Sequence, residues 1–284
     1  MKPEDFLNPE NFDKITPDMY EELNRQIDDI WEGGCHGDCG SCESDCNSNA
    51  YPKFAKALFA VTSGKGGTGK STVTALLARN LAARGLKVAI LDADLPGATM
   101  PRLLGVAGPV SSNGDKVVPV QVDDNIKLLS YALIADDPFE PVLWPGGDMF
   151  NVVNYLYNSG LWEEDNDVFL IDMPSGAGDV PLNLLTAFPV DGTVIVGEPS
   201  ELAVDPLRRC VAMTRMFLSS PVAYVENKSL DGAAHLAPQL DLGAKCVNFA
   251  LPLSPELISA PGGVVTPDLA PMIDEVAEHL ITLI

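Results

Sequence analysis

A glycine-rich loop carries the clearest chemistry in this sequence. It reads Gly-Lys-Gly-Gly-Thr-Gly-Lys-Ser from Gly64 to Ser71. Glycines let backbone N–H groups converge on phosphate oxygens, Lys70 can neutralise β- and γ-phosphates, and Ser71 can ligate Mg²⁺. This P-loop predicts that the protein binds a nucleoside triphosphate with magnesium and hydrolyses it. The predicted nucleotide-binding residues of this segment are Gly64, Lys65, Gly66, Gly67, Thr68, Gly69, Lys70, Ser71 and Thr72.

Three aspartates directly follow two expected strands. Residues 88–91 run into Asp92 and Asp94, and residues 168–171 run into Asp172. Ligands of doubly wound folds bind at the carboxyl ends of the strands, so we expect these carboxylates to lie near the P-loop. Asp92 or Asp94 could instead cap a helix.

Four cysteines lie close together near the start of the chain, at Cys35, Cys39, Cys42 and Cys46. Disulfides between them would close very short loops, so the clustering favours a metal site. Four thiolates on a loop that contains Gly and Ser suit either a [4Fe-4S] cluster or tetrahedral zinc, and free or disulfide-bonded thiols remain a third alternative. His36 lies inside the loop and could replace one ligand.

The elements that position these residues follow an α/β pattern. Short β-branched runs alternate with helical stretches from residue 57 onward, which predicts a doubly wound, mostly parallel sheet with helices on both faces. Strands are expected at residues 58–62, 88–91, 126–131, 168–171, 193–196, 222–225 and 246–250. Helices are expected at residues 70–84, 203–218 and 268–283. We therefore expect an ATPase domain over residues 57–284, preceded by an extension over residues 1–56 with one helix between Thr16 and Gly33 and the four-cysteine loop.

Composition limits the function classes. The chain has 18 basic and 40 acidic residues, a formal net charge of −22, which argues against binding to nucleic acid. No apolar run is long enough to span a bilayer, and the first residues lack the pattern of a secretory signal. We expect a cytoplasmic protein with no membrane partner.

The loop also resembles the deviant P-loop of the SIMIBI class, because a second lysine, Lys65, directly follows its first glycine. This class includes MinD and ParA ATPases, nitrogenase iron protein and the Mrp/ApbC iron-sulfur carriers. In it, the early lysine reaches across a homodimer interface to the partner's nucleotide. The resemblance implies a homodimer with ATP at the interface and catalytic roles for Lys65, Lys70 and Asp94. Of these residues, Asp94 would position the attacking water. The resemblance also places Asp92 and Asp172 around magnesium together with Ser71.

Within this class the sequence is most similar to the Mrp/ApbC carriers, over about residues 58–255. The similarity rests on Asp92-Ala93-Asp94, Leu103-Leu104-Gly105, Val142-Leu143-Trp144, residues 172–179 and Val225-Glu226-Asn227. It implies that Asn227 hydrogen-bonds adenine, which favours ATP over GTP, and that Gly176 presents its N–H to the γ-phosphate. It also implies an ATPase that carries or assembles iron-sulfur clusters and delivers them to an apo acceptor protein.

The sequence departs from this family after Asn227. Many Mrp/ApbC carriers hold a bridging cluster through a Cys-x-x-Cys pair near this point, whereas this chain continues Lys-Ser-Leu-Asp-Gly. Cys246 is expected to stand alone in a buried strand. The layout instead resembles family members with a four-cysteine cluster ahead of the ATPase domain, which favours a [4Fe-4S] cluster on the N-terminal cysteines, with zinc as the alternative.

Two other functions agree with the same motifs. One is an ATP-driven electron donor like nitrogenase iron protein, which would keep its cluster and serve a redox partner. The other is a nucleotide switch like MinD or ParA, with the cysteines holding a structural zinc. The acidic C-terminus and the net charge of −22 count against the membrane and DNA contacts that such switches use.

Overall fold

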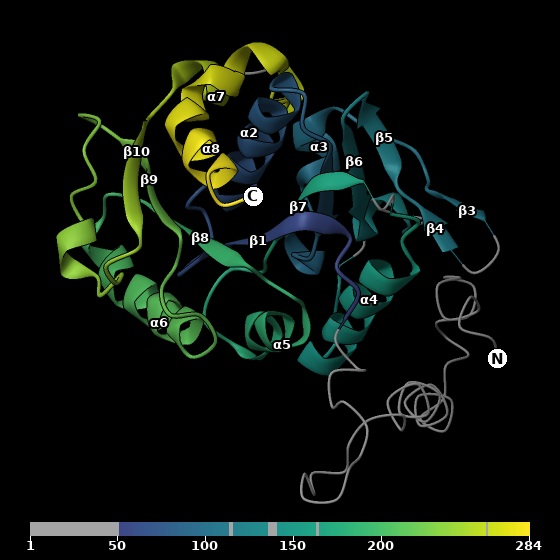
Figure 1. The fold of residues 1–284 in the computed structure, drawn as a ribbon, viewed down its shortest axis with the longest axis horizontal. Coiled ribbons are helices and arrows are strands. Elements are labelled where there is room, and N and C mark those ends of the chain that lie inside the picture. The colour runs from purple at the N-terminus through teal and green to yellow at the C-terminus, as the bar shows by residue number, and fades with distance from the viewer. Residues whose placement is uncertain (1–50, 114–115, 136–140, 163–164, 260) are drawn as a thin grey trace, which may run out of the picture.

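The computed structural model describes residues 51–113, 116–135, 141–162, 165–259 and 261–284. In this part of the chain, eight strands form one sheet in the order β10-β9-β8-β1-β7-β2-β6-β5 (Figure 1). Every neighbouring pair is parallel except the edge strand β5, which runs antiparallel to β6. The strands are β1 (Ala55–Ser63), β2 (Val88–Asp92), β5 (Val120–Asp123), β6 (Ile126–Ser130), β7 (Asn166–Asp172), β8 (Gly192–Gly197), β9 (Ala223–Ser229) and β10 (Val247–Pro252), with a separate hairpin of β3 (Ser111–Asn113) and β4 (Lys116–Val118).

Helices cover both faces of this sheet, as the sequence predicted. Figure 1 shows α2, α3, α7 and α8 on one face and α4, α5 and α6 on the other. The α-helices are α2 (Lys70–Ala83), α3 (Met100–Leu104), α4 (Gly146–Ser159), α5 (Asp179–Ala187), α6 (Val204–Arg215), α7 (Pro255–Ser259) and α8 (Asp274–Ile281). The 3-10 helices are η3 (Leu95–Gly97), η4 (Tyr131–Leu133), η5 (Glu201–Ala203), η6 (Ala237–Gln239), η7 (Pro261–Gly263) and η8 (Pro267–Ile273).

The central strand β1 shows why the sheet needs two helical layers. Phe59 and Val61 belong to the core beneath α2 and α8, whereas Leu58 and Ala60 belong to the core beneath α4 and α5. Successive side chains of a strand point to opposite faces, so a run of apolar residues is stable only when both faces are covered. All seven strands expected from such runs are present.

The predicted C-terminal helix is wrong in its first half. Residues 267–273 form the 3-10 helix η8, and α-helix begins only at Asp274. Pro271 has no N–H to donate within an α-helix. The Ala270 carbonyl, moreover, accepts the Asn80 side chain of α2 at 2.8 Å. The missing N–H of Pro271 and the contact with α2 therefore both favour the 3-10 conformation over the predicted α-helix in this segment.

Two expectations for other segments have different outcomes. Cys246 was expected in a buried strand, but it is partly exposed and directly precedes β10, which is an edge strand with exposed residues. The expected N-terminal helix and the four clustered cysteines lie outside the described residues.

The chain enters the domain at the amino end of β1. The Tyr157 hydroxyl of α4 donates to the Pro52 carbonyl at 2.6 Å, and the Tyr51 ring lies edge-on to Phe188 with centroids 5.4 Å apart. Because the P-loop follows the carboxyl end of β1, the entering segment and the P-loop lie at opposite ends of this strand.

Candidate nucleotide-binding site

Strand register brings the predicted site together at one edge of the sheet. Val61 of β1 lies opposite Asp172 of β7, and Asp172 lies opposite Asp92 of β2. The P-loop leaves β1 two residues later and leads directly into α2. The sequence context required for a P-loop, a strand before it and a helix after it, is therefore present.

The backbone of the P-loop fits a phosphate group. Gly67 and Gly69 have φ angles of 83° and 87°, a left-handed conformation that favours glycine. No side chain caps the start of α2, so its first N–H groups are available to an anion. The Thr68 hydroxyl is buried without a hydrogen-bond partner among the described atoms, which leaves a further donor in the loop.

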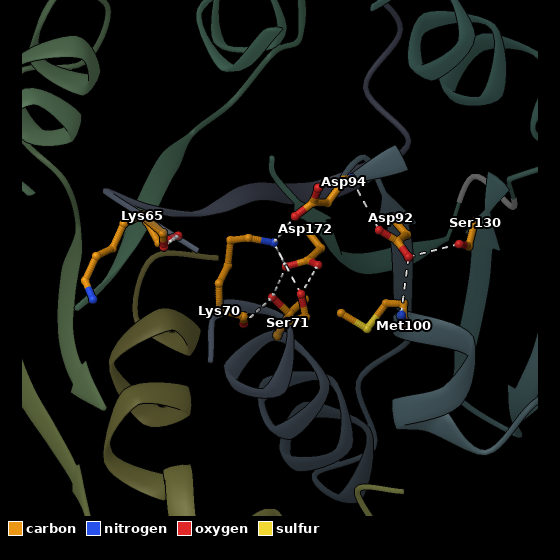
Figure 2. A network of polar contacts seen from close by, with 10 residues as sticks. Lys65, Lys70, Ser71, Asp92, Asp94, Met100, Ser130 and Asp172 are labelled. Atoms are coloured by element: carbon orange, nitrogen blue, oxygen red, sulfur yellow. Dashed lines mark hydrogen bonds and ion pairs between the residues drawn. The ribbon is translucent and has the colours of Figure 1, made fainter. Parts of the chain in front are cut away.

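Lys70, Ser71 and Asp172 form the centre of the site, as Figure 2 shows. The Lys70 ammonium lies 2.9 Å from Asp172 Oδ1 and 3.6 Å from Asp94 Oδ2, and the Ser71 hydroxyl donates to Asp172 Oδ2 at 2.6 Å. The Lys70 side chain is only 5% exposed. Burial lowers the pKa of Lys70, but the charges of Asp172 and Asp94 outweigh it and raise this pKa above its ordinary value. Lys70 is therefore a buried cation beside the phosphate-binding backbone.

Asp92 lies beside this centre, and its Oδ1 accepts the Asp94 N–H at 3.3 Å. Its carboxylate accepts the Ser130 hydroxyl at 2.9 Å and the Met100 N–H at 3.3 Å (Figure 2). Met100 is the first residue of α3, whose N-cap is Thr99, so Asp92 contacts the start of this helix without being its N-cap. Burial, and after it the charge of Asp172, raises the pKa of Asp92. Its place in a magnesium shell stays a prediction, as does the water-positioning role of Asp94.

Gly176 and Asn227 both lie against the P-loop segment. The Gly176 N–H donates to the Ser63 carbonyl at 2.8 Å, and the Asn227 amide donates to the Thr68 carbonyl at 2.8 Å. In this structure these groups brace the loop. Their predicted contacts with the γ-phosphate and adenine stay predictions.

Three residues of the site were not singled out from the sequence. Thr74 donates to Asp172 at 2.9 Å, and its position one helical turn after Lys70 could have indicated this contact. Glu198 follows β8 and forms an ion pair with Lys65, and Lys228 at the end of β9 contacts the same carboxylate. The Lys65 side chain points away from Lys70 (Figure 2).

Gly64 should be indispensable for the structure of the loop. A Cβ atom at this position would lie 2.5 Å from the Pro206 backbone of α6, whereas a Cβ at Gly66 would meet Ser175 Oγ at an ordinary 3.7 Å. We expect Gly64→Ala to lower the free energy of unfolding by about 1–3 kcal/mol and Gly66→Ala to change it by less than about 0.5 kcal/mol. Denaturant unfolding without nucleotide measures both. Equal midpoints for the two variants would contradict the close approach.

Neither a membrane span nor a cluster of His, Cys, Asp and Glu ligands is found in the described ranges. No helix there is long and apolar enough to cross a membrane. The same ranges contain no group of three or more His, Cys, Asp or Glu side chains that could hold a metal ion.

Comparison with protein families gives a match that spans most of the domain. Residues 55–239 match the ParA-type family described as NUBPL iron-transfer P-loop NTPase. A protein of Clostridium perfringens called iron-sulfur cluster carrier protein is 36% identical over 205 residues, covering 66% of this chain and 72% of that protein. A protein of the same name from Methanocaldococcus jannaschii is 33% identical over 219 residues, covering 69% of this chain and 72% of its own length.

Solved structures agree with the fold. A nucleotide-binding protein from Archaeoglobus fulgidus, solved in complex with ADP, superposes with a TM-score of 0.60 at 28% identity and covers 79% of this chain and 89% of its own. The cell division ATPase MinD of Pyrococcus furiosus superposes with a TM-score of 0.57 at 24% identity, covering 81% of this chain and 100% of its own. The latter likeness shows the fold alone.

Proposed function

The chain belongs to the NUBPL-type iron-transfer P-loop NTPases, the family of the Mrp/ApbC iron-sulfur carriers, and from this premise we propose that it is an ATP-hydrolysing carrier of a [4Fe-4S] cluster. The observation that carries the ATP-binding part of the proposal is the buried contact of Lys70 and Ser71 with Asp172 at the start of α2. Lysine, hydroxyl and carboxylate at a helix N-terminus are the groups that bind phosphate and magnesium.

In this proposal the P-loop backbone holds the phosphates of ATP. Lys70 balances their charge when it turns from Asp172 and Asp94, and these carboxylates lie within 3.6 Å of its ammonium. Ser71 and Asp172 would hold Mg²⁺, which when bound neutralises negative charge on the phosphates. Asp94 orients the attacking water. Asn227 would contact adenine once its amide leaves the Thr68 carbonyl.

The proposed active form is a homodimer with ATP between the subunits. Lys65 is partly exposed, at 34%, and its ammonium is directed away from the Lys70 site of its own chain. A cation in this position is suited to act on the nucleotide of a second subunit. There it would stabilise charge that develops on the transferred phosphoryl group.

The proposed cargo site is the set of four N-terminal cysteines, Cys35, Cys39, Cys42 and Cys46. In the described part of the chain, burial raises the pKa of Cys210 to about 11 and that of Cys246 to about 12, which disfavours the thiolate form that binds metal. The proposal therefore assigns cluster delivery to the N-terminal set, and the recipient is an apo iron-sulfur protein.

Cluster transfer tests this function. The full chain, reconstituted anaerobically with iron and sulfide, should activate an apo [4Fe-4S] enzyme, and ATP with Mg²⁺ should change the rate of activation. A protein that keeps its cluster and is reversibly reduced in step with ATP hydrolysis would instead be an electron donor. A protein that binds zinc and no iron would contradict both of these functions.

A further inference from the structure

Glu198 lies between two lysines beside the P-loop. It directly follows β8, and β8 pairs with β1 so that Val196 lies opposite Ser63 at the start of the loop. Lys65 is ion-paired with Glu198 Oε1, and the Lys228 ammonium lies 3.4 Å from Oε2. Each carboxylate oxygen therefore has its own cation.

The backbones on both sides of the Lys65–Glu198 pair are fixed locally. The Ser63 hydroxyl donates to the Lys65 carbonyl at 3.1 Å, and the Ser200 N–H donates to the Glu198 carbonyl at 2.7 Å. The hydrogen bond from Lys65 lowers the pKa of Glu198, so the carboxylate is ionised at neutral pH. The pair thus directs Lys65 toward β8 of its own chain and away from Lys70 (Figure 2).

Lys228 is held in place independently of Lys65. Its ammonium also donates to the Gly67 carbonyl of the P-loop. Its φ angle is 62°, and within the described residues it is the single non-glycine residue with a positive φ. Such a conformation is unfavourable for lysine and persists when the surroundings hold it. Glu198 would therefore keep one cation partner if Lys65 moved away.

We propose that Glu198 is a positioning residue that retains Lys65 in its own subunit, and that Lys228 keeps this carboxylate paired when Lys65 is released. The inference rests on the proposed action of Lys65 on the nucleotide of a second subunit. Lys65 and Glu198 are both partly exposed, at 34% and 20%, so their pair is weak enough to exchange reversibly. Dimer formation then competes with an internal ion pair, and Glu198 sets the protein concentration at which the ATPase becomes active.

Two variants with opposite expected effects test this role. Glu198→Gln removes the charge that holds Lys65 and should lower the protein concentration for half-maximal specific ATPase activity. The expected decrease is about two- to fivefold for each lysine released, thus about 4- to 25-fold for a dimer. Lys228→Gln removes the second cation but keeps a donor for the Gly67 carbonyl, and should raise that concentration. Turnover at saturating protein should change less than about twofold in the Glu198 variant.

Two controls separate the possible failures. Titration with a fluorescent ADP analogue should give the same affinity in wild type and Glu198→Gln, because Glu198 contacts neither Lys70 nor Ser71 among the described contacts. A shift of both activity curves in the same direction, or lower turnover of Glu198→Gln at every concentration, would overturn the role of Glu198. Lys65→Ala is measured alongside. If Lys65→Ala loses turnover while the Glu198→Gln curve matches that of wild type, only the role of Glu198 is contradicted. Full turnover of Lys65→Ala would contradict both the proposed function of Lys65 and the role of Glu198.

Discussion

Lys70→Ala should weaken ATP binding about 100-fold and destabilise the nucleotide-free protein by about 3 kcal/mol. Affinity falls because a cation beside the phosphate-binding backbone is lost. Stability falls because Asp172, with a side chain 1% exposed, would lose the cation 2.9 Å away and remain as a buried carboxyl group without its ion-pair partner. Equilibrium titration with ATP and denaturant unfolding without nucleotide measure the two effects separately.

Lys53→Ala is the matched control for the Lys70 variant. Lys53 also forms an ion pair, with Asp191 at 2.8 Å, but its side chain is 36% exposed. An exposed pair contributes about 1 kcal/mol or less, so this variant should keep its stability within that limit and its ATP affinity unchanged. Equal losses of stability in the two variants would contradict the buried character of the Lys70 contacts.

Lys65→Ala should reduce ATP turnover about 10³-fold while ATP affinity changes less than about threefold. Lys65 points away from Lys70, so the ground-state contacts of a bound phosphate in the same chain do not depend on it. Its expected task is to stabilise charge that forms during phosphoryl transfer in the partner's site, and such an interaction affects turnover and not binding. Steady-state ATPase assays at saturating protein, with nucleotide titrations, give both quantities.

Lys56→Ala provides the comparison for the Lys65 variant. Lys56 is ion-paired with Asp167 at 2.6 Å. It lies at the amino end of β1, whereas the P-loop follows the carboxyl end of this strand. Its removal should leave turnover at the wild-type value. Wild-type turnover in Lys65→Ala would refute a role of this lysine in the partner's site.

Much of the fold could be predicted from the sequence because its signals are local. Buried runs such as residues 88–91 indicate parallel strands, and the apolar stretch that ends before Gly85 indicates α2. The nucleotide-binding loop is equally local, since its glycines and Lys70 lie within eight positions of the chain. The first half of the predicted C-terminal helix is wrong because η8 contains Pro271 and contacts Asn80, which is 190 positions from Ala270.

The rest of the site depends on strand order. Lys65 and Glu198 are 133 positions apart, and they meet because β8 happens to lie beside β1. Asn227 reaches the Thr68 carbonyl across 159 positions. Neither the spacing of residues in the sequence nor its composition predicts such a contact between distant residues. The contact of Asp92 with Ser130 likewise follows from the pairing of β2 with β6.

The central claim, an ATPase that carries an iron-sulfur cluster on its N-terminal cysteines, is tested most directly by metal analysis after anaerobic reconstitution of the full chain. Iron, sulfide and zinc are measured together with the electron paramagnetic resonance spectrum of the reduced protein. A variant with Ala at Cys35, Cys39, Cys42 and Cys46 is treated identically. We expect about four iron and four sulfide per chain with a [4Fe-4S] signal in wild type, and neither in the variant, which should still bind ATP. Zinc without iron in wild type, or equal iron in both proteins, would contradict the claim.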